Sequence, residues 1–428
     1  MAEVVERTPR AGVSQPAAAR PRRRALRTLE AFESPAFRFL WLNTLSFSLV
    51  QGIQRFAFVW LVIDALERPA SWGGLVTFAL GIPAMFLMLP AGVLSDRMSR
   101  RNLLISTQVL SLVVLAGGTV MIAAGIMTPG LALLVAVGTG ATTALGTPVR
   151  TAVLPALVDR DKLMNAIVMS TVGQNIMMIG GPIFGGAAIK LWGIEAGFGI
   201  QTAAYGIGLL ALIPLRMPEP GAPRVQRRPL HELLEGFDFV WKHREIKALV
   251  FTLMVSGLFM LGPVFALVPP IVRDEMGKGA FAASMLFGIM AVGMLSTSLV
   301  LASVGNFGSK GAWFILNLAV GGIDVALMGI VDSYALLAVL MFIWGMGGGI
   351  FMNLNRTLIQ SHTPDPLMGR VMSIQSLGMA GFSPLGGLLA GALSGPLGAT
   401  AFMVAAGMIL TAVSLATFIA QPGLRRMA

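Results

Sequence analysis

Long apolar runs follow one another along almost the whole chain, separated by short polar stretches. The apolar residues within a run are continuous rather than alternating, and most runs reach the roughly 18 residues that a helix needs to cross a bilayer. Because only helices and closed barrels satisfy their backbone hydrogen bonds in lipid, this pattern predicts an all-α integral membrane protein. The twelve expected helices cover residues 36–64, 71–94, 102–126, 129–150, 163–188, 198–215, 247–270, 281–304, 312–331, 333–353, 370–392 and 398–420.

Most of the expected connections are short, as in a compact bundle, but the segment 216–246 is an exception. It opens with Pro218, Pro220, Gly221 and Pro223 and continues with basic residues, which is typical of a linker. We therefore expect two pseudo-symmetric bundles of six helices joined by this linker. The resulting division is a basic tail of 1–35, a first bundle of 36–215, the linker of 216–246, a second bundle of 247–420 and a tail of 421–428.

The second part of the linker has the periodicity of an amphipathic helix. Apolar residues recur on one face and polar residues fall opposite, which favours a short helix lying on the inner membrane surface. A cytosolic extension of the seventh span is the alternative. The apolar positions are Leu230, Leu233, Leu234, Phe237 and Trp241, and the polar ones are His231, Glu232, Glu235, Asp238 and Lys242.

The two halves carry similar blocks of proline and glycine. The block in span five contains Gly181, Pro182, Gly185 and Gly186, and the block in span eleven contains Pro384, Gly386 and Gly387. Each block follows an arginine near the inner end of a helix, Arg150 or Arg356, and then a polar loop, of which the second ends at Arg370. Such imperfect internal repeats place a substrate site between the halves, near the middle of the membrane.

The chain has few charged residues, and they are placed unevenly along it. Charged residues make up 12% of the chain, about half the share in soluble domains, and the formal net charge is +11. Almost all Lys and Arg fall on one side of the expected helices, which by the positive-inside rule places both termini in the cytoplasm. The basic charge therefore indicates a lipid bilayer as partner and not nucleic acid. Residues 1–35 contain no apolar stretch of the kind found in a cleaved signal peptide.

The insert between the second and third runs carries one acid and three arginines. Its residues Gly92, Asp96, Arg97, Arg100 and Arg101 form a pattern that resembles the loop signature of the major facilitator superfamily, with Ser99 in place of a glycine. The resemblance implies that this loop is a gate: Asp96 meets the start of span eleven, around 369–371, when the inner side is shut. It also implies that Arg97 and Arg101 are held by nearby acids, such as Asp159 or Asp161. A turn that only fixes topology is the alternative.

The span-five block also resembles a signature of drug/proton antiporters of that superfamily. Pro182 bends the helix, and Gly181 and Gly185 share a face and let another helix approach closely. Tight packing alone is the alternative reading of this block.

Ionisable residues inside the bilayer are costly and so are functional candidates. Arg55 and Asp64 are nine residues apart, which turns a helix by half a turn net, so they point to opposite faces. In the superfamily spans one, four, seven and ten line the cavity, and we expect Gln51 and Arg55 to face it. Arg55 would hold an anionic substrate group or a coupling carboxylate, or it is a structural arginine. Asp324 in span nine is either a proton site or an interhelical contact.

No catalytic signature is present. The three histidines form no metal-binding pattern, the chain has no cysteine, and there is no phosphate-binding loop, so we expect no enzyme, no metal and no cofactor. The resemblance covers nearly all of 36–420 and points to the branch of enterobactin exporters and macrolide efflux proteins. It implies a monomer in a bacterial inner (plasma) membrane that exports siderophore- or drug-type small molecules by alternating access, as an antiporter with protons. Ion-coupled uptake and a non-transporting receptor or enzyme remain as alternatives.

Overall fold

The computed structural model describes residues 30–97, 99–159, 161–215, 229–304 and 308–427, and in this part every regular element is a helix. The all-α prediction is therefore confirmed. The first half contains η1 (Glu30–Glu33), α1 (Pro35–Trp60) with its continuation η2 (Leu61–Ala65), α2 (Ala70–Arg97), α3 (Arg100–Ala123), α4 (Pro129–Leu157), α5 (Leu163–Trp192) and α6 (Ile194–Leu212). The second half contains α7 (Pro229–Lys242), α8 (Arg244–Ser256), η3 (Gly257–Leu261), α9 (Gly262–Asp274), α10 (Ala280–Val304), α11 (Lys310–Met328), α12 (Tyr334–Ser361), α13 (Asp365–Leu397), α14 (Ala399–Ala420) and α15 (Pro422–Arg426).

Local sequence explains where several helices begin and end. Ser34 and Thr128 accept a hydrogen bond from the third residue of α1 and α4, and each is followed by a proline at the first helical position. Gly193 and Gly398 have φ of +84° and +86°, so single glycines turn the chain from α5 into α6 and from α13 into α14. The two turns lie at corresponding places in the two halves, which agrees with the expected internal repeat.

Among the described residues, eleven helices are long and apolar enough to cross a membrane. The expected count of twelve spans is therefore not confirmed. The segments α8, η3 and α9 together form one span, Arg244–Asp274. The helix not included is α6, which overlaps the expected sixth span and packs against α1 and α3. Its residues Glu195 and Gln201 and its several glycines lower its apolar character.

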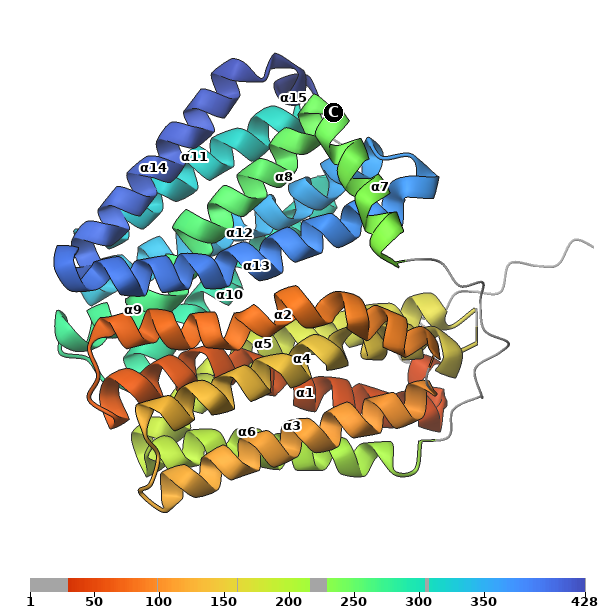
Figure 1. Cartoon of the computed structure of the whole chain (residues 1–428), viewed down its shortest axis with the longest axis vertical. Helices are drawn as coiled ribbons and strands as arrows, with labels where there is room; N and C mark the ends of the chain where they lie inside the picture. Colours follow the sequence, from red (N-terminus) through yellow and green to blue (C-terminus); the bar gives the residue numbers. More distant parts are fainter. Residues whose placement is uncertain (1–29, 98, 160, 216–228, 305–307, 428) are drawn as a thin grey trace, which may run out of the picture.

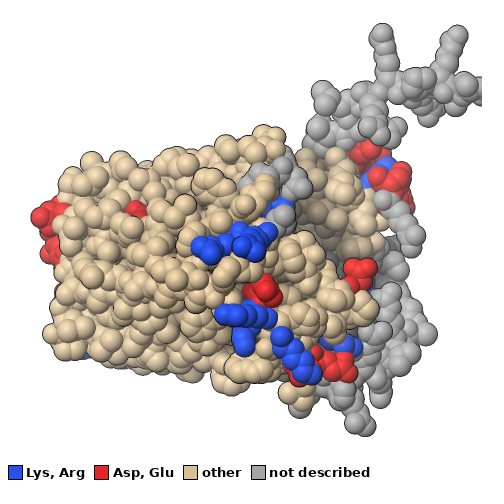
Figure 2. Space-filling model, turned by 90° about the horizontal axis from the view of Figure 1, so that it is seen from above, with Lys and Arg blue, Asp and Glu red and all other residues tan. Residues whose placement is uncertain are grey.

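The two halves lie close together at one end and spread apart at the other (Figure 1). We call the end that carries η1, α7 and α15 the linker end, and the end that carries the α1–α2 and α5–α6 connections the far end. Between the halves α2 runs along α13 and α5 runs along α10. Charged side chains gather toward the two ends, and the wall between them is almost free of charge, as expected for a surface in contact with lipid (Figure 2).

The buried core follows the same division. One cluster of buried residues joins both halves and includes Phe56 and Trp60 of α1, Leu267 of α9 and Leu286 of α10. Toward the linker end each half instead has its own clusters, which do not cross to the other half. Among the described residues, the buried cluster that joins the halves therefore lies in the part nearer the far end.

Candidate transport site between the two halves

The proline-glycine blocks bring helices of the two halves into close contact. A Cβ atom at Gly186 of α5 would lie 1.7 Å from Ser284 Oγ of α10, and one at Gly387 of α13 would lie 2.9 Å from Thr77 Cγ2 of α2. A side chain at either position would require its neighbour in the other half to shift. The blocks thus pack α5 and α13 against helices of the opposite half.

The neighbouring glycines of each block face the first span of their own half. A Cβ atom at Gly181 would lie 2.9 Å from Gly52 Cα, and one at Gly185 would lie 2.6 Å from Ile53 Cγ2, both in α1. In the same way, a Cβ atom at Gly386 would lie 2.5 Å from Leu258 O of η3. Adjacent helical residues point about 100° apart, so two successive glycines serve two neighbouring helices. The close helix approach expected at Gly181 and Gly185 is present.

The contribution of glycines in α2 to the contact with α13 was not foreseen from the sequence. Cβ atoms at Gly74 and Gly81 of α2 would lie 2.2 Å from Gly387 O and 2.0 Å from Pro384 Cγ of α13. Small residues seven apart on one helix are the signal that predicts such a contact, but they do not name the partner helix.

Arg55 lies where the halves meet, in the part of the first span nearer the far end. Its Cζ atom is 4.8 Å from the centroid of the Phe265 ring of α9, which belongs to the opposite half. One turn away on α1, Gln51 Nε2 donates to Thr143 Oγ1 of α4 at 3.0 Å. Arg55 is exposed, whereas every residue from Phe56 to Ile63 is buried. The space around Arg55 is therefore closed on the side toward the far end.

Aromatic rings form that closure. Phe265 stacks on Phe287 of α10 at 5.5 Å and meets Trp344 of α12 edge-on at 6.1 Å. Phe287 in turn lies 6.4 Å from Phe56 of α1. An exposed cation on one of these rings, with an amide and a hydroxyl one helix turn away, can hold a ligand that has both a polar group and an apolar body.

A family model for transmembrane secretion effectors matches residues 27–425 of this chain. The chain belongs to this family of major facilitator transporters. The protein is therefore a multi-pass membrane transporter and not an enzyme.

Two relatives of this transporter are enterobactin exporters named EntS. They come from Shigella boydii serotype 18 and Escherichia coli O139:H28, and each is 24% identical over 403 residues, covering 92% of this chain and 93% of the relative. The transporter thus has exporters among its relatives, at low identity.

Solved structures of other transporters share the fold. A mutant of the nucleoside transporter NupG has a TM-score of 0.75 at 15% identity and covers 91% of this chain and 99% of its own. A bacterial homolog of the human lysosomal transporter Spinster, in an inward-facing and unoccupied conformation, has a TM-score of 0.71 at 14% identity and covers 94% of this chain and 98% of its own.

The expected gating loop of this transporter is mostly helical. Gly92, Asp96 and Arg97 belong to the end of α2, and Ser99 caps α3, which begins at Arg100. The side chains of 92–98 lie outside the described residues, so the contact expected for Asp96 stays a prediction. Its expected partner region, 369–371, is not the start of a helix, because α13 begins at Asp365.

The expected tether of Arg101 to an acid is wrong. Arg101 Nε donates to Leu215 O at 2.8 Å, and its Nη2 donates to Ile213 O at 3.1 Å. The carbonyls at the end of a helix lack partners within that helix, and a guanidinium near the end of α6 satisfies them.

Arg150 and Arg356, which precede the proline-glycine blocks of the two halves, lie in different surroundings. Arg150 is buried inside the first half, where its Nε donates to Asn43 Oδ1 at 3.2 Å and its Nη2 to Gln108 Oε1 at 2.5 Å. Its Cζ atom lies 3.7 Å from the centroid of the Phe47 ring. Arg356 is exposed, because the neighbouring Asn355 takes the buried face of α12.

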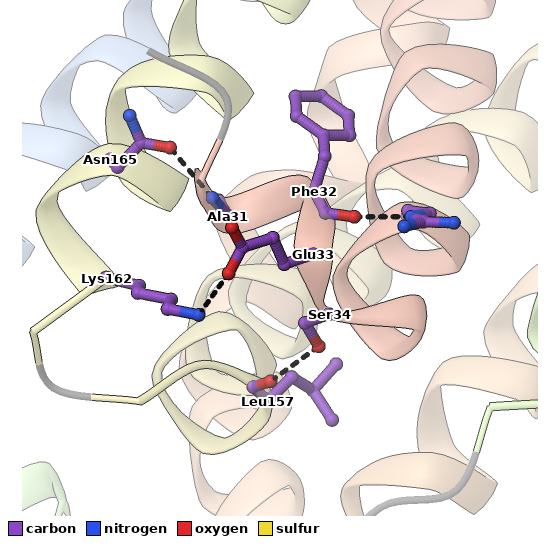
Figure 3. A network of polar contacts seen from close by, with 8 residues as sticks. Ala31, Phe32, Glu33, Ser34, Leu157, Lys162 and Asn165 are labelled. Atoms are coloured by element: carbon purple, nitrogen blue, oxygen red, sulfur yellow. Dashed lines mark hydrogen bonds and ion pairs between the residues drawn. The ribbon is translucent and has the colours of Figure 1, made fainter. Parts of the chain in front are cut away.

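Ion pairs at the linker end hold neighbouring segments of the chain together. The third expected arginine, Arg370 of α13, pairs with Glu235 of α7. Lys162 Nζ lies 2.6 Å from Glu33 Oε2, and the Ala31 amide donates to Asn165 Oδ1 at 3.1 Å, so η1 is held against the start of α5 (Figure 3). The hydrogen bond to Glu33 favours the ammonium and raises the pKa of Lys162.

The two candidate acids lie away from Arg55. Asp64 is exposed in η2 at the far end. Asp324 is 3% exposed in α11, which packs on α12 and α14. Within the described residues neither of its carboxylate oxygens has a hydrogen-bond partner, and both roles considered for Asp324 stay predictions. The same part of the chain holds no cluster of His, Asp and Glu suited to a metal.

Proposed function

We propose that this transporter exports an amphipathic small molecule from a bacterial cell by alternating access, in exchange for protons and as a monomer. In this proposal the linker end, with both termini, faces the cytoplasm. The gathering of basic residues on that side of the expected helices supports this orientation. The export direction is supported by the relatives, which are named enterobactin exporters.

The observation that carries the proposal is the exposed Arg55 held on Phe265 across the two halves. The site is closed toward the far end by aromatic rings and by glycine contacts, so a substrate would enter from the linker end. When the glycine contacts open and the linker ends meet, the same site would face the far side. That motion is the one that alternating access between two repeats requires.

The chemistry of the site supports a siderophore- or drug-type substrate with an acidic or phenolic group. The guanidinium of Arg55 would bind that group, and the rings of Phe265 and Trp344 would contact the apolar body. Gln51 and Thr143 would add an amide and a hydroxyl.

Asp324 is the residue that we propose for proton coupling. A carboxylate that is buried in a membrane without a partner is costly, so such a group suits the uptake and release of a proton. Asp64 is less suited because it is exposed at the far end.

The test is accumulation of a panel of dyes, antibiotics and siderophores in an efflux-deficient bacterium, with and without a protonophore. The protein is compared with empty vector, with Arg55→Gln and with Arg425→Gln, a change of equal charge in α15. Wild type and Arg425→Gln should lower the accumulation of some compound, the protonophore should abolish this effect, and Arg55→Gln should resemble the vector. Higher accumulation than in the vector would indicate uptake, and export that is insensitive to the protonophore would rule out proton coupling.

A further inference from the structure

A cavity of about 670 Å³ lies at the linker end of the second half, among α7, α8, α13 and α14. All of its lining residues belong to the second half and its linker helix, so it is separate from the site around Arg55. It is bordered by Trp241, Arg244 and Lys247 at one end and by Phe251, Met254 and Val413 further in.

The outer part of this cavity is cationic. Arg244 is the first residue of α8 and Lys247 lies one turn later, so both side chains can reach the same group. Arg244 Nη2 donates to Ala420 O at 3.0 Å, which occupies one of its five N–H donors. Lys247 Nζ lies 5.0 Å from the centroid of the Trp241 ring. No ion pair with a carboxylate is recorded for either cation in the part of the chain that the structure describes.

The inner part of the cavity is apolar. Phe251 and Met254 lie seven and ten residues beyond Arg244 in α8, which corresponds to about 10–15 Å along the helix axis. Phe251 lies inside a membrane span and is 52% exposed, as an apolar side chain that faces lipid is. The cavity therefore opens to the lipid side. An alkyl chain fits this part, and a small anion alone would leave it unfilled.

The helix α7 covers the cavity at the linker end. Phe237 and Trp241 of α7 stack at 5.9 Å and are 51% and 62% exposed. An exposed apolar stripe with a tryptophan on an amphipathic helix is typical of the boundary between lipid headgroups and acyl chains. Figure 2 shows basic side chains gathered toward this end of the second half.

We propose that this cavity binds an anionic phospholipid. The phosphate lies between Arg244 and Lys247, and an acyl chain runs along Phe251 and Met254. Because α7 covers the cavity and is also paired to α13 through Glu235 and Arg370, the lipid helps to hold the linker helix on the second half. A zwitterionic lipid would compensate the two cations less completely, which makes the site selective for lipids with net negative charge.

The test is native mass spectrometry of the full chain in detergent, titrated with phosphatidylglycerol or with phosphatidylcholine of the same acyl chains. Wild type should retain phosphatidylglycerol at least tenfold better than phosphatidylcholine. The double variant Arg244→Gln with Lys247→Gln should bind phosphatidylglycerol about thirtyfold more weakly. The control is Arg425→Gln with Arg426→Gln, which removes the same charge at the same end outside the cavity and should bind as wild type does.

A second variant tests the apolar part without changing charge. Ala416→Trp places a large side chain in the cavity and should also weaken phosphatidylglycerol binding, with an unchanged elution profile on size exclusion. Equal binding by the double variant and wild type, or equal loss in the control, would overturn the proposal. So would competition by inorganic phosphate, which would indicate a site for the anion alone, or displacement by an exported compound, which would indicate a substrate path.

Discussion

The guanidinium of Arg55 in the first half lies 4.8 Å from the centroid of the Phe265 ring in the second half. Arg55 is the last exposed residue of α1, and this cation–π contact joins the halves at that depth. Contacts of this kind contribute about 0.5–2 kcal/mol, which is small enough to break when the halves move. The residue proposed to bind substrate is therefore also one that responds to the relative position of the halves.

Substitutions of Arg55 should separate anionic from neutral substrates. Arg55→Gln removes the charge and should lower transport of an anionic substrate about tenfold or more relative to a neutral one of similar size, because hydrogen bonds to charged groups contribute about 1.5–3 kcal/mol. Arg55→Lys keeps the charge and should retain most of the preference. The measurement is the ratio of initial transport rates, and an equal loss for both substrates would show that Arg55 is structural.

Gly186 should control which side of the transporter is open. A methyl group there would overlap Ser284, so Gly186→Ala should disfavour the observed contact between α5 and α10. The expected result is less access to the site from the linker end and more from the far end. Because the chain has no cysteine, a single Thr147→Cys on the exposed side of α4 can report this through its rate of labelling with maleimide.

Two further variants serve as controls for that experiment. Ser284→Gly combined with Gly186→Ala removes the overlap and should restore the labelling rate. Gly199→Ala adds a methyl group in α6 where no atom lies within 4 Å, and should leave labelling unchanged. If Gly186→Ala labels as wild type does, the contact between α5 and α10 does not limit opening.

Helix positions were largely predictable from the sequence, because continuous apolar runs bounded by polar residues depend only on local sequence. The close approach of Gly181 and Gly185 to another helix was predictable for the same reason. What could not be predicted is which way each helix is turned about its axis. Asn355 rather than Arg356 faces the interior of the second half, and a shift of one residue, about 100°, decides this.

Contacts between distant segments also depend on tertiary packing. Arg101 binds the carbonyls of Ile213 and Leu215 because the end of α6 lies beside the start of α3. The position of Phe265 over Arg55 depends on how the two halves meet. Sequence spacing within one helix contains no information about either contact.

Arg150 should be important for stability, in contrast to Arg356. Replacing Arg150 with Met leaves the buried oxygens of Asn43 and Gln108 without their donors, which costs about 1–3 kcal/mol for each such group. Arg356→Met changes an exposed side chain and should cost little. The measurement is the unfolding midpoint in detergent, and equal midpoints for the two variants would contradict the buried hydrogen-bond network.

Asp324 should couple transport to the proton gradient. Asp324→Asn keeps the shape of the side chain but removes its ability to release a proton, so an imposed pH gradient should no longer drive substrate movement in proteoliposomes. Exchange of substrate across the membrane without a gradient should persist, since the site around Arg55 is intact. Asp64→Asn is the matched control, because Asp64 is exposed at the far end and should remain coupled. If Asp324→Asn still responds to the gradient and Asp64→Asn does not, the coupling role belongs to Asp64; if both respond, neither of these acids carries the proton.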